Sequence, residues 1–127
     1  MNQIVVDSSI LIDFLRRSDK HLSPLVKILE EGYSLVISIV THTELYSGKS
    51  IWEQESALKT MEELLAGFKI ISLSEPISQQ AGKLKAFFGV PIFDSIIAAT
   101  ALTENLPLAT LNEKHFRKVP KLKIIQL

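Results

Sequence analysis

Residues 4–9 read Ile4-Val5-Val6-Asp7-Ser8-Ser9, an apolar run that ends in a carboxylate and two hydroxyls. Such an unbroken apolar run predicts a strand buried on both faces, as in a parallel sheet that is covered by helices. Ser8 or Ser9 can cap a helix that begins at Ile10, which puts Asp7 at the carboxyl end of the strand. In open α/β sheets this edge is where ligands bind. Asp7 is therefore either a local helix cap or the start of an active site.

Apolar runs alternate with helical patterns along the rest of the chain. The predicted strands after residues 4–6 are residues 35–39, 68–73, 107–110 and 122–126, the last of them at an edge. The predicted helices are residues 10–17, 24–31, 41–47, 52–65, 77–88 and 95–102, with a helical turn at 113–116. Strands that alternate with helices predict an α/β fold with a mostly parallel sheet flanked on both sides.

Composition narrows the class of protein. The chain has 127 residues, of which 46% are hydrophobic and 22% charged, and this predicts one compact domain over residues 1–127. The absence of cysteine excludes a disulfide scaffold, a thiolate zinc site and a cysteine nucleophile. No basic leader precedes the first apolar run and no apolar stretch is long enough to span a bilayer, so we expect a cytoplasmic protein with no membrane partner.

Polar side chains follow several of the apolar segments. Asp7, Glu44 and Asp94 each lie at or near a predicted helix start, and Asn112 closely follows the strand at 107–110. Carboxylates gathered in one pocket repel each other, so a cation is needed to hold them together. An oxygen-only ligand set favours Mg²⁺ or Mn²⁺ over Zn²⁺. Such an ion can activate water and neutralise charge on a phosphodiester.

Each of these positions also has a purely structural interpretation. The spacing of Thr41 and Glu44 matches a capping box, in which Glu44 would reach back to the start of its helix. Asp7 and Asp94 are alternatively ordinary helix N-caps, and Asn112 is alternatively part of an Asx-turn. The occurrence of all four beside elements of one parallel sheet favours a shared site.

Two hydroxyls and a basic segment are secondary candidates. Ser9 and Thr110 flank Asp7 and Asn112, where they either orient a reacting water or make capping and turn bonds. The net charge is zero, but the C-terminal part of the chain is basic. We expect either RNA backbone contacts or an exposed basic turn from a set of four residues: Lys114, His115, Arg117 and Lys118.

Four segments together resemble the motifs of PIN-domain nucleases, and most closely those of VapC-type toxins. The segments are residues 6–13 (VDSSILID), 38–48 (SIVTHTELYSG), 91–102 (PIFDSIIAATAL) and 108–116 (LATLNEKHF). The resemblance implies a three-layer α/β/α sandwich and Mg²⁺- or Mn²⁺-dependent endonucleolytic cleavage of RNA by a water that the metal activates. It also implies a homodimer and inhibition by a VapB-like antitoxin.

The resemblance also implies roles for individual residues. Asp7, Glu44 and Asp94 would be the acidic metal-site residues, with Asn112 and Ser9 orienting the attacking water. Asn112 stands where many relatives carry a fourth aspartate. This difference keeps open an alternative function, a catalytically weakened PIN-like module that binds RNA or protein. A third reading is a phosphatase or phosphoacceptor domain with Asp7 as nucleophile, although Ser9 stands where such domains often have a second aspartate.

Overall fold

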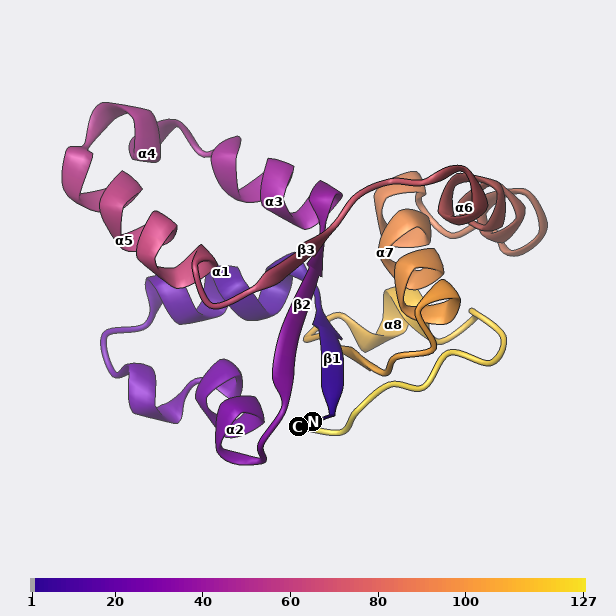
Figure 1. The fold of residues 1–127 in the computed structure, drawn as a ribbon, viewed down its shortest axis with the longest axis horizontal. Helices are drawn as coiled ribbons and strands as arrows, with labels where there is room; N and C mark the ends of the chain where they lie inside the picture. The colour runs from indigo at the N-terminus through magenta and orange to yellow at the C-terminus, as the bar shows by residue number, and fades with distance from the viewer. Residues whose placement is uncertain (1) are drawn as a thin grey trace.

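A computed structural model describes residues 2–127, and its centre is a four-stranded sheet (Figure 1). The strand order is β3-β2-β1-β4, and all three neighbouring pairs are parallel. The strands are β1 (Gln3–Val6), β2 (Ser34–Ser38), β3 (Lys69–Ile71) and β4 (Leu108–Ala109). The prediction of a parallel sheet is confirmed.

Helices cover both faces of the sheet, which confirms the three-layer arrangement. In Figure 1, α1, α2, α4 and α5 lie on one side of the sheet, and α6, α7 and α8 lie on the other. Their bounds are α1 (Ser8–Arg16), α2 (Pro24–Glu30), α3 (Ile39–Tyr46), α4 (Lys49–Glu53), α5 (Glu55–Leu65), α6 (Glu75–Phe88), α7 (Ile92–Thr103) and α8 (Glu113–Phe116). A short 3₁₀ helix, η1 (Lys20–Leu22), joins α1 to α2. No helix within residues 2–127 is long and apolar enough to cross a membrane.

Alternate side chains of β1 enter the two hydrophobic cores. Ile4 and Val6 pack with α1, α2 and α5, whereas Val5 packs with α6 and α7. All three side chains are fully buried. This is the burial on both faces that the unbroken apolar run predicts.

The predicted edge strand at 122–126 is wrong. Only Ile124 forms a bridge, in parallel with Leu108, so no regular ladder develops. Two features limit the pairing. β4 has only two residues to offer, and Lys121 just before the segment has a positive φ of 66°, which turns the chain away from an extended course.

The order of the strands determines where a site can form. From β1 the chain first builds β2 and β3 on one side, and later returns to add β4 on the other side. The position where the strand order reverses, between β1 and β4, leaves a crevice at the carboxyl ends of the strands. Asp7 directly follows β1, and Thr110 directly follows β4. These two residues therefore lie side by side at the edge of the sheet where ligands bind in open α/β folds.

Candidate active site

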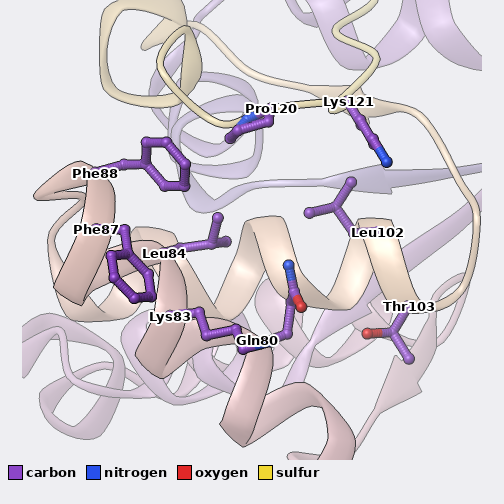
Figure 2. Close-up of a pocket in the computed structure, with 9 residues that line it drawn as sticks. All are labelled: Gln80, Lys83, Leu84, Phe87, Phe88, Leu102, Thr103, Pro120 and Lys121. Atoms are coloured by element: carbon purple, nitrogen blue, oxygen red, sulfur yellow. The ribbon is translucent and has the colours of Figure 1, made fainter.

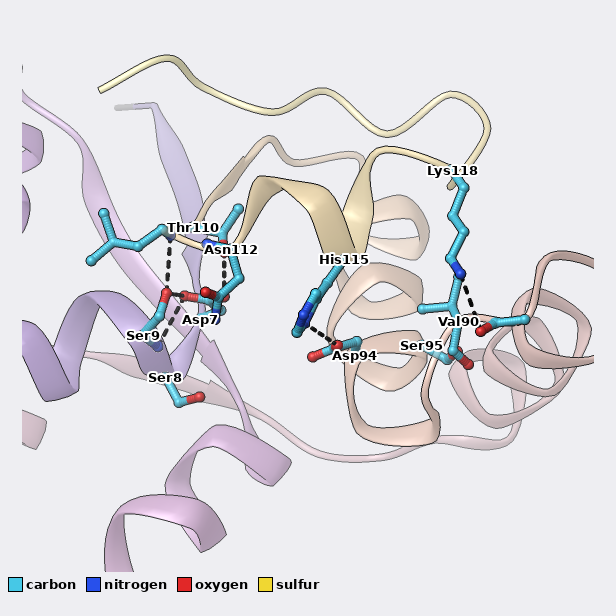
Figure 3. A network of polar contacts seen from close by, with 12 residues as sticks. Asp7, Ser8, Ser9, Val90, Asp94, Ser95, Thr110, Asn112, His115 and Lys118 are labelled. Carbon is cyan, nitrogen blue, oxygen red and sulfur yellow. Dashed lines mark hydrogen bonds and ion pairs between the residues drawn. The ribbon is translucent and has the colours of Figure 1, made fainter.

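Asp7 is the buried centre of the crevice, with only 3% of its surface exposed. It is the N-cap of α1, because Oδ1 accepts hydrogen bonds from the backbone amides of Ser9 (3.1 Å) and Ile10 (3.4 Å). The same carboxylate accepts hydroxyl hydrogen bonds of 2.5 Å each, from Ser9 to Oδ1 and from Thr110 to Oδ2. Figure 3 shows both hydroxyls directed at Asp7. The predicted cap is therefore present, and it is combined with a contact from the far end of the chain.

The two hydroxyls connect Asp7 to the segment that follows β4. The Ser9 hydroxyl accepts from the backbone amide of Leu111 (3.0 Å), and the Thr110 hydroxyl accepts from that of Asn112 (2.9 Å). A hydroxyl has a single proton, and that of Ser9 is donated to Asp7. Of the two roles expected for these hydroxyls, the described residues show the capping and turn bonds, through which Ser9 and Thr110 fix the Asp7 carboxylate. The orientation of a reacting water stays a prediction.

Burial dominates the ionisation of Asp7. Desolvation raises the pKa of its carboxyl above the ordinary value of 3.8, although the hydrogen bonds from Ser9, Thr110 and Ile10 oppose the shift. A carboxylate that is costly to ionise is stabilised by any cation that binds beside it. The protein thus holds Asp7 in a position where its charge is unfavourable without a partner.

Glu44 reaches the same region from α3. This helix begins at Ile39 and is capped by Ser38, whose hydroxyl accepts from the amide of Val40 (3.1 Å), so the predicted Thr41–Glu44 capping box is wrong. Glu44 is free to point elsewhere, and its Oε2 accepts from the Ser8 hydroxyl at 3.3 Å. Thr41 is instead buried inside the helix.

The ionisation of Glu44 indicates that the three carboxylates are neighbours. Its pKa is raised above 4.5, mainly by burial and further by the negative charges of Asp94 and Asp7, while the Ser8 hydrogen bond opposes the shift. Charges in a protein influence one another strongly only at short range. The charges of Asp7 and Asp94 thus act on Glu44, and we call the surroundings of these three residues the acidic region. That they form one site stays a prediction.

Asp94 lies in the first turn of α7, not at its N-cap. Pro91 occupies the cap position, so the N-cap interpretation of Asp94 is wrong. Asp94 Oδ2 lies 3.1 Å from His115 Nδ1, and 23% of the Asp94 side chain is exposed (Figure 3). An accessible carboxylate in the first turn also benefits from the positive end of the helix dipole.

The short helix α8 connects the two halves of the acidic region. The backbone amide of its cap residue Asn112 donates to the Thr110 hydroxyl, which places Asn112 beside Asp7. Its third helical residue, His115, pairs with Asp94. The exposed Asn112 side chain caps no backbone amide within residues 2–127, so it remains available. An Asx-turn at Asn112 is thus not formed by the described residues.

The predicted basic contact residues divide into two kinds. His115 is engaged with Asp94, and Lys118 donates to the carbonyl of Gly89 at 3.3 Å. Lys114 and Arg117 are exposed on and just after α8. The four side chains are therefore close in sequence but do not form one uniform patch.

The donor set suits a hard divalent cation that keeps part of its hydration. No three His, Cys, Asp or Glu side chains among residues 2–127 are grouped closely enough to cage an ion by themselves. Mg²⁺ commonly binds through one or two carboxylates together with water and substrate phosphate, so a complete protein cage is not required. Mutual repulsion at Glu44 is the feature that a cation would relieve.

A hollow of about 590 Å³ opens from this region along α1. Glu44 and Asn112 line one part of it, and Arg16 and Arg17 line another. Sequence reasoning does not single out these arginines, although their spacing of eight residues from Ser8 and Ser9 places them on the same helix rows. A separate hollow of about 500 Å³ between α6, α7 and the C-terminal segment contains exposed Phe87 and none of the candidate carboxylates (Figure 2).

Thr110→Val is expected to loosen the Asp7 cluster. Valine has nearly the same shape but removes the donor to Asp7 and the acceptor for the Asn112 amide, both largely buried. The free energy of unfolding in urea should fall by about 1–3 kcal/mol, and NMR titration should show a higher pKa for Asp7. Thr60→Val, which removes an exposed hydroxyl bonded only to the Ser56 carbonyl, is the matched control. Equal stability losses in the two variants would contradict this role of Thr110.

The raised pKa of Asp7 predicts a pH dependence of stability. With a chelator present, the folded state holds the Asp7 proton more tightly than the unfolded state, whose pKa is near 3.8. Protonation therefore contributes stability below that pH, and the contribution is lost as the pH rises through the higher folded pKa. Asp7→Asn has no such proton, so its stability relative to the parent should rise as the pH increases from about 4 toward neutral in urea denaturation. A constant difference across that range would contradict the direction of the shift.

The sheet order and the acidic region at the strand reversal agree with the family that the sequence itself matches. The chain belongs to the PIN domain family, whose sequence profile matches residues 4–122.

Particular relatives are similar over nearly the whole chain. Ribonuclease VapC10 of Mycobacterium tuberculosis is 34% identical over 125 residues, which cover 94% of this chain and 90% of the relative. Ribonuclease VapC1 of Methanocaldococcus jannaschii is 33% identical over 123 residues, with 93% and 82% covered.

Solved structures have the same fold. A toxin–antitoxin complex from Klebsiella pneumoniae contains a chain that is 30% identical, with 94% of each chain covered and a TM-score of 0.75. A chain of the DNA-bound VapBC from Salmonella typhimurium aligns with a TM-score of 0.82, and the alignment covers 98% of each chain. Its sequence identity is 20%, so this similarity supports the fold alone.

Proposed function

We propose that this chain is a Mg²⁺- or Mn²⁺-dependent endoribonuclease and the toxin of a toxin–antitoxin pair. The observation that supports the proposal is that Asp7 follows β1 at the strand reversal of a PIN-domain sheet, where the charges of Asp7 and Asp94 act on Glu44. The similarity to ribonucleases named VapC, over more than nine-tenths of the chain, supports RNA as the substrate.

Asp7 and Asp94 are the residues that would hold the cation, and Glu44 would either complete its shell or accept the proton of the attacking water. Oδ2 of Asp7 accepts only from Thr110 among residues 2–127, whereas Oδ1 accepts from three donors, so Oδ2 has acceptor capacity left for a ligand. When bound, the cation supplies positive charge to the phosphodiester and lowers the pKa of a nearby water. Ser9 and Thr110 serve this function by keeping the Asp7 carboxylate in place.

Glu44 is the residue we assign to proton transfer. A general base works best when its pKa lies near the working pH, and the pKa of Glu44 is shifted in that direction. It accepts the proton of the attacking water, while the free amide of Asn112 orients that water by a hydrogen bond. The attack on phosphorus breaks the bond to the 3′ oxygen, and this oxygen takes up a proton from solvent water. The products are a 5′-phosphate and a 3′-hydroxyl.

The proposed partners follow from the relatives. The solved neighbours include toxin–antitoxin complexes, so we propose that a VapB-like antitoxin binds this chain and blocks cleavage. We also propose a homodimer, which the family resemblance implies.

A direct assay tests the proposal. The purified chain is incubated with 5′-labelled single-stranded RNA in Mg²⁺, in Mn²⁺ and in EDTA, and products are mapped on a denaturing gel with their end groups. We expect cleavage with either ion and none in EDTA. RNA binding without products in any condition would instead favour the binding-module alternative, which the asparagine at position 112 keeps open. A covalent aspartyl-phosphate would favour the phosphoacceptor alternative.

A further inference from the structure

Helix α1 lines the hollow beside the acidic region with two rows of side chains. Residues four apart on a helix lie one above another, so each row joins positions i, i+4 and i+8. All six members of the two rows line the hollow: Ser8, Ile12 and Arg16 in one row, and Ser9, Asp13 and Arg17 in the other. A wall of this kind runs continuously from one end of the helix to the other.

Each row starts at a serine that is bonded to a candidate carboxylate, and each ends at an arginine. Ser8 donates to Glu44, and Ser9 donates to Asp7, so the beginning of α1 is bonded to the acidic region. Arg16 and Arg17 stand at the other end of the helix. The hollow is therefore acidic where chemistry is proposed and basic about two helical turns away.

The two arginines differ in their partners. Arg17 is held by Asp13, with 2.7 Å between Nε and Oδ2. The exposed Arg16 side chain has no hydrogen bond or ion pair with any of residues 2–127. The carbonyls at the end of α1 do not need it, because Lys20 already donates to those of Phe14 and Arg17. The N–H donors of its guanidinium are thus available to a ligand in the hollow.

The distance along α1 suits a nucleic-acid strand. Eight residues separate Ser8 from Arg16, which corresponds to a rise of about 12 Å. Arg16 and Glu44 line the same hollow, so the wall formed by α1 leads from the cation to the acidic region. At about 3.4 Å per nucleotide of a stacked strand, a few nucleotides cover this span.

We propose that Arg16 is a phosphate-binding subsite, which contacts an RNA backbone phosphate a few nucleotides from the linkage that is cut. The arginine fork suits a phosphate because it can donate two parallel hydrogen bonds. Arg17 is the less suited of the two, because Asp13 already accepts from its Nε and balances its charge. The inference rests on the proposed ribonuclease function for the identity of the strand, and it assigns the course of that strand along α1.

Binding in EDTA tests the subsite without any cleavage. Fluorescence anisotropy of a labelled single-stranded oligouridylate is measured over a series of NaCl concentrations. Arg16→Gln should weaken binding about tenfold at low salt, since a charge-assisted hydrogen bond is lost. The slope of log affinity against log salt should decrease by about 0.7, the value for one phosphate contact with a single strand. Arg16→Lys should retain the slope, because lysine retains the charge.

Lys27→Gln is the matched control, because Lys27 is an exposed cation on α2 outside the hollow. Equal affinity and slope in Arg16→Gln and Lys27→Gln would overturn the subsite, as would absence of RNA binding by the parent. A lower melting temperature with an unchanged salt slope would show a structural role instead and would also overturn it. A parent that binds through Arg16 but yields no product in Mg²⁺ or Mn²⁺ would contradict the proposed nuclease function and leave the subsite standing.

Discussion

Asp7→Asn is expected to abolish RNA cleavage while the fold stays intact. The amide lacks the charge that a divalent cation requires, so the rate should fall by at least about 10³-fold in the gel assay. The oxygen of the amide can still accept at the start of α1, and the Thr110 hydroxyl can accept from the new NH₂ group. Circular dichroism should therefore match that of the parent.

The stability of the same variant separates function from folding. Because burial makes the Asp7 charge unfavourable, its removal should leave the free energy of unfolding at neutral pH, without metal, equal to or above that of the parent. Asp19→Asn is the control, since Asp19 caps η1 on the surface and asparagine caps equally well. Parent-like cleavage by purified Asp7→Asn would remove Asp7 from the site.

Glu44→Gln is the second variant with a large expected effect. Glutamine has the same size but cannot take a proton from water, and general base catalysis contributes about 10²–10⁴-fold to rates. Cleavage should fall within that range. The acid limb of the parent's pH–rate profile, which reports the ionisation of the base, should disappear in Glu44→Gln.

A surface glutamate provides the control for this variant. Glu62→Gln, on the exposed face of α5, removes one negative charge outside the hollows that Glu44 lines and should cleave like the parent. If Glu44→Gln retained the parent's rate and pH profile, Glu44 would have no part in proton transfer.

The sequence predicts the sheet and the carboxylates better than the contacts between distant segments. The run Ile4-Val5-Val6 identifies a strand buried on both faces, and Asp7 follows it at the edge where ligands bind. The hydrogen bond from Thr110 to Asp7 joins residues 103 positions apart. No local pattern reports such a contact, which depends on β4 pairing beside β1.

Local signals also conflict at particular residues. Ser38 and Thr41 are both acceptable helix caps, and the choice of Ser38 follows from burial of Val40 and Thr41 against the core. The apolar residues of 122–126 suggest a strand, but β4 has only two residues and is too short to pair with a regular strand. Arg16 resembles an ordinary basic residue in the last turn of a helix until the hollow beside it is known.

Mn²⁺ titration followed by electron paramagnetic resonance tests most directly whether Asp7, Glu44 and Asp94 share one cation. The parent should show saturable Mn²⁺ binding that added Mg²⁺ displaces. Asp7→Asn, Glu44→Gln and Asp94→Asn should each weaken that binding by about tenfold or more. Even the loss of a residue that only hydrogen-bonds to a metal ligand lowers metal affinity by about 10–100-fold. Identical Mn²⁺ affinities in the parent and all three variants, or no binding by the parent, would show that these side chains do not form a common metal site.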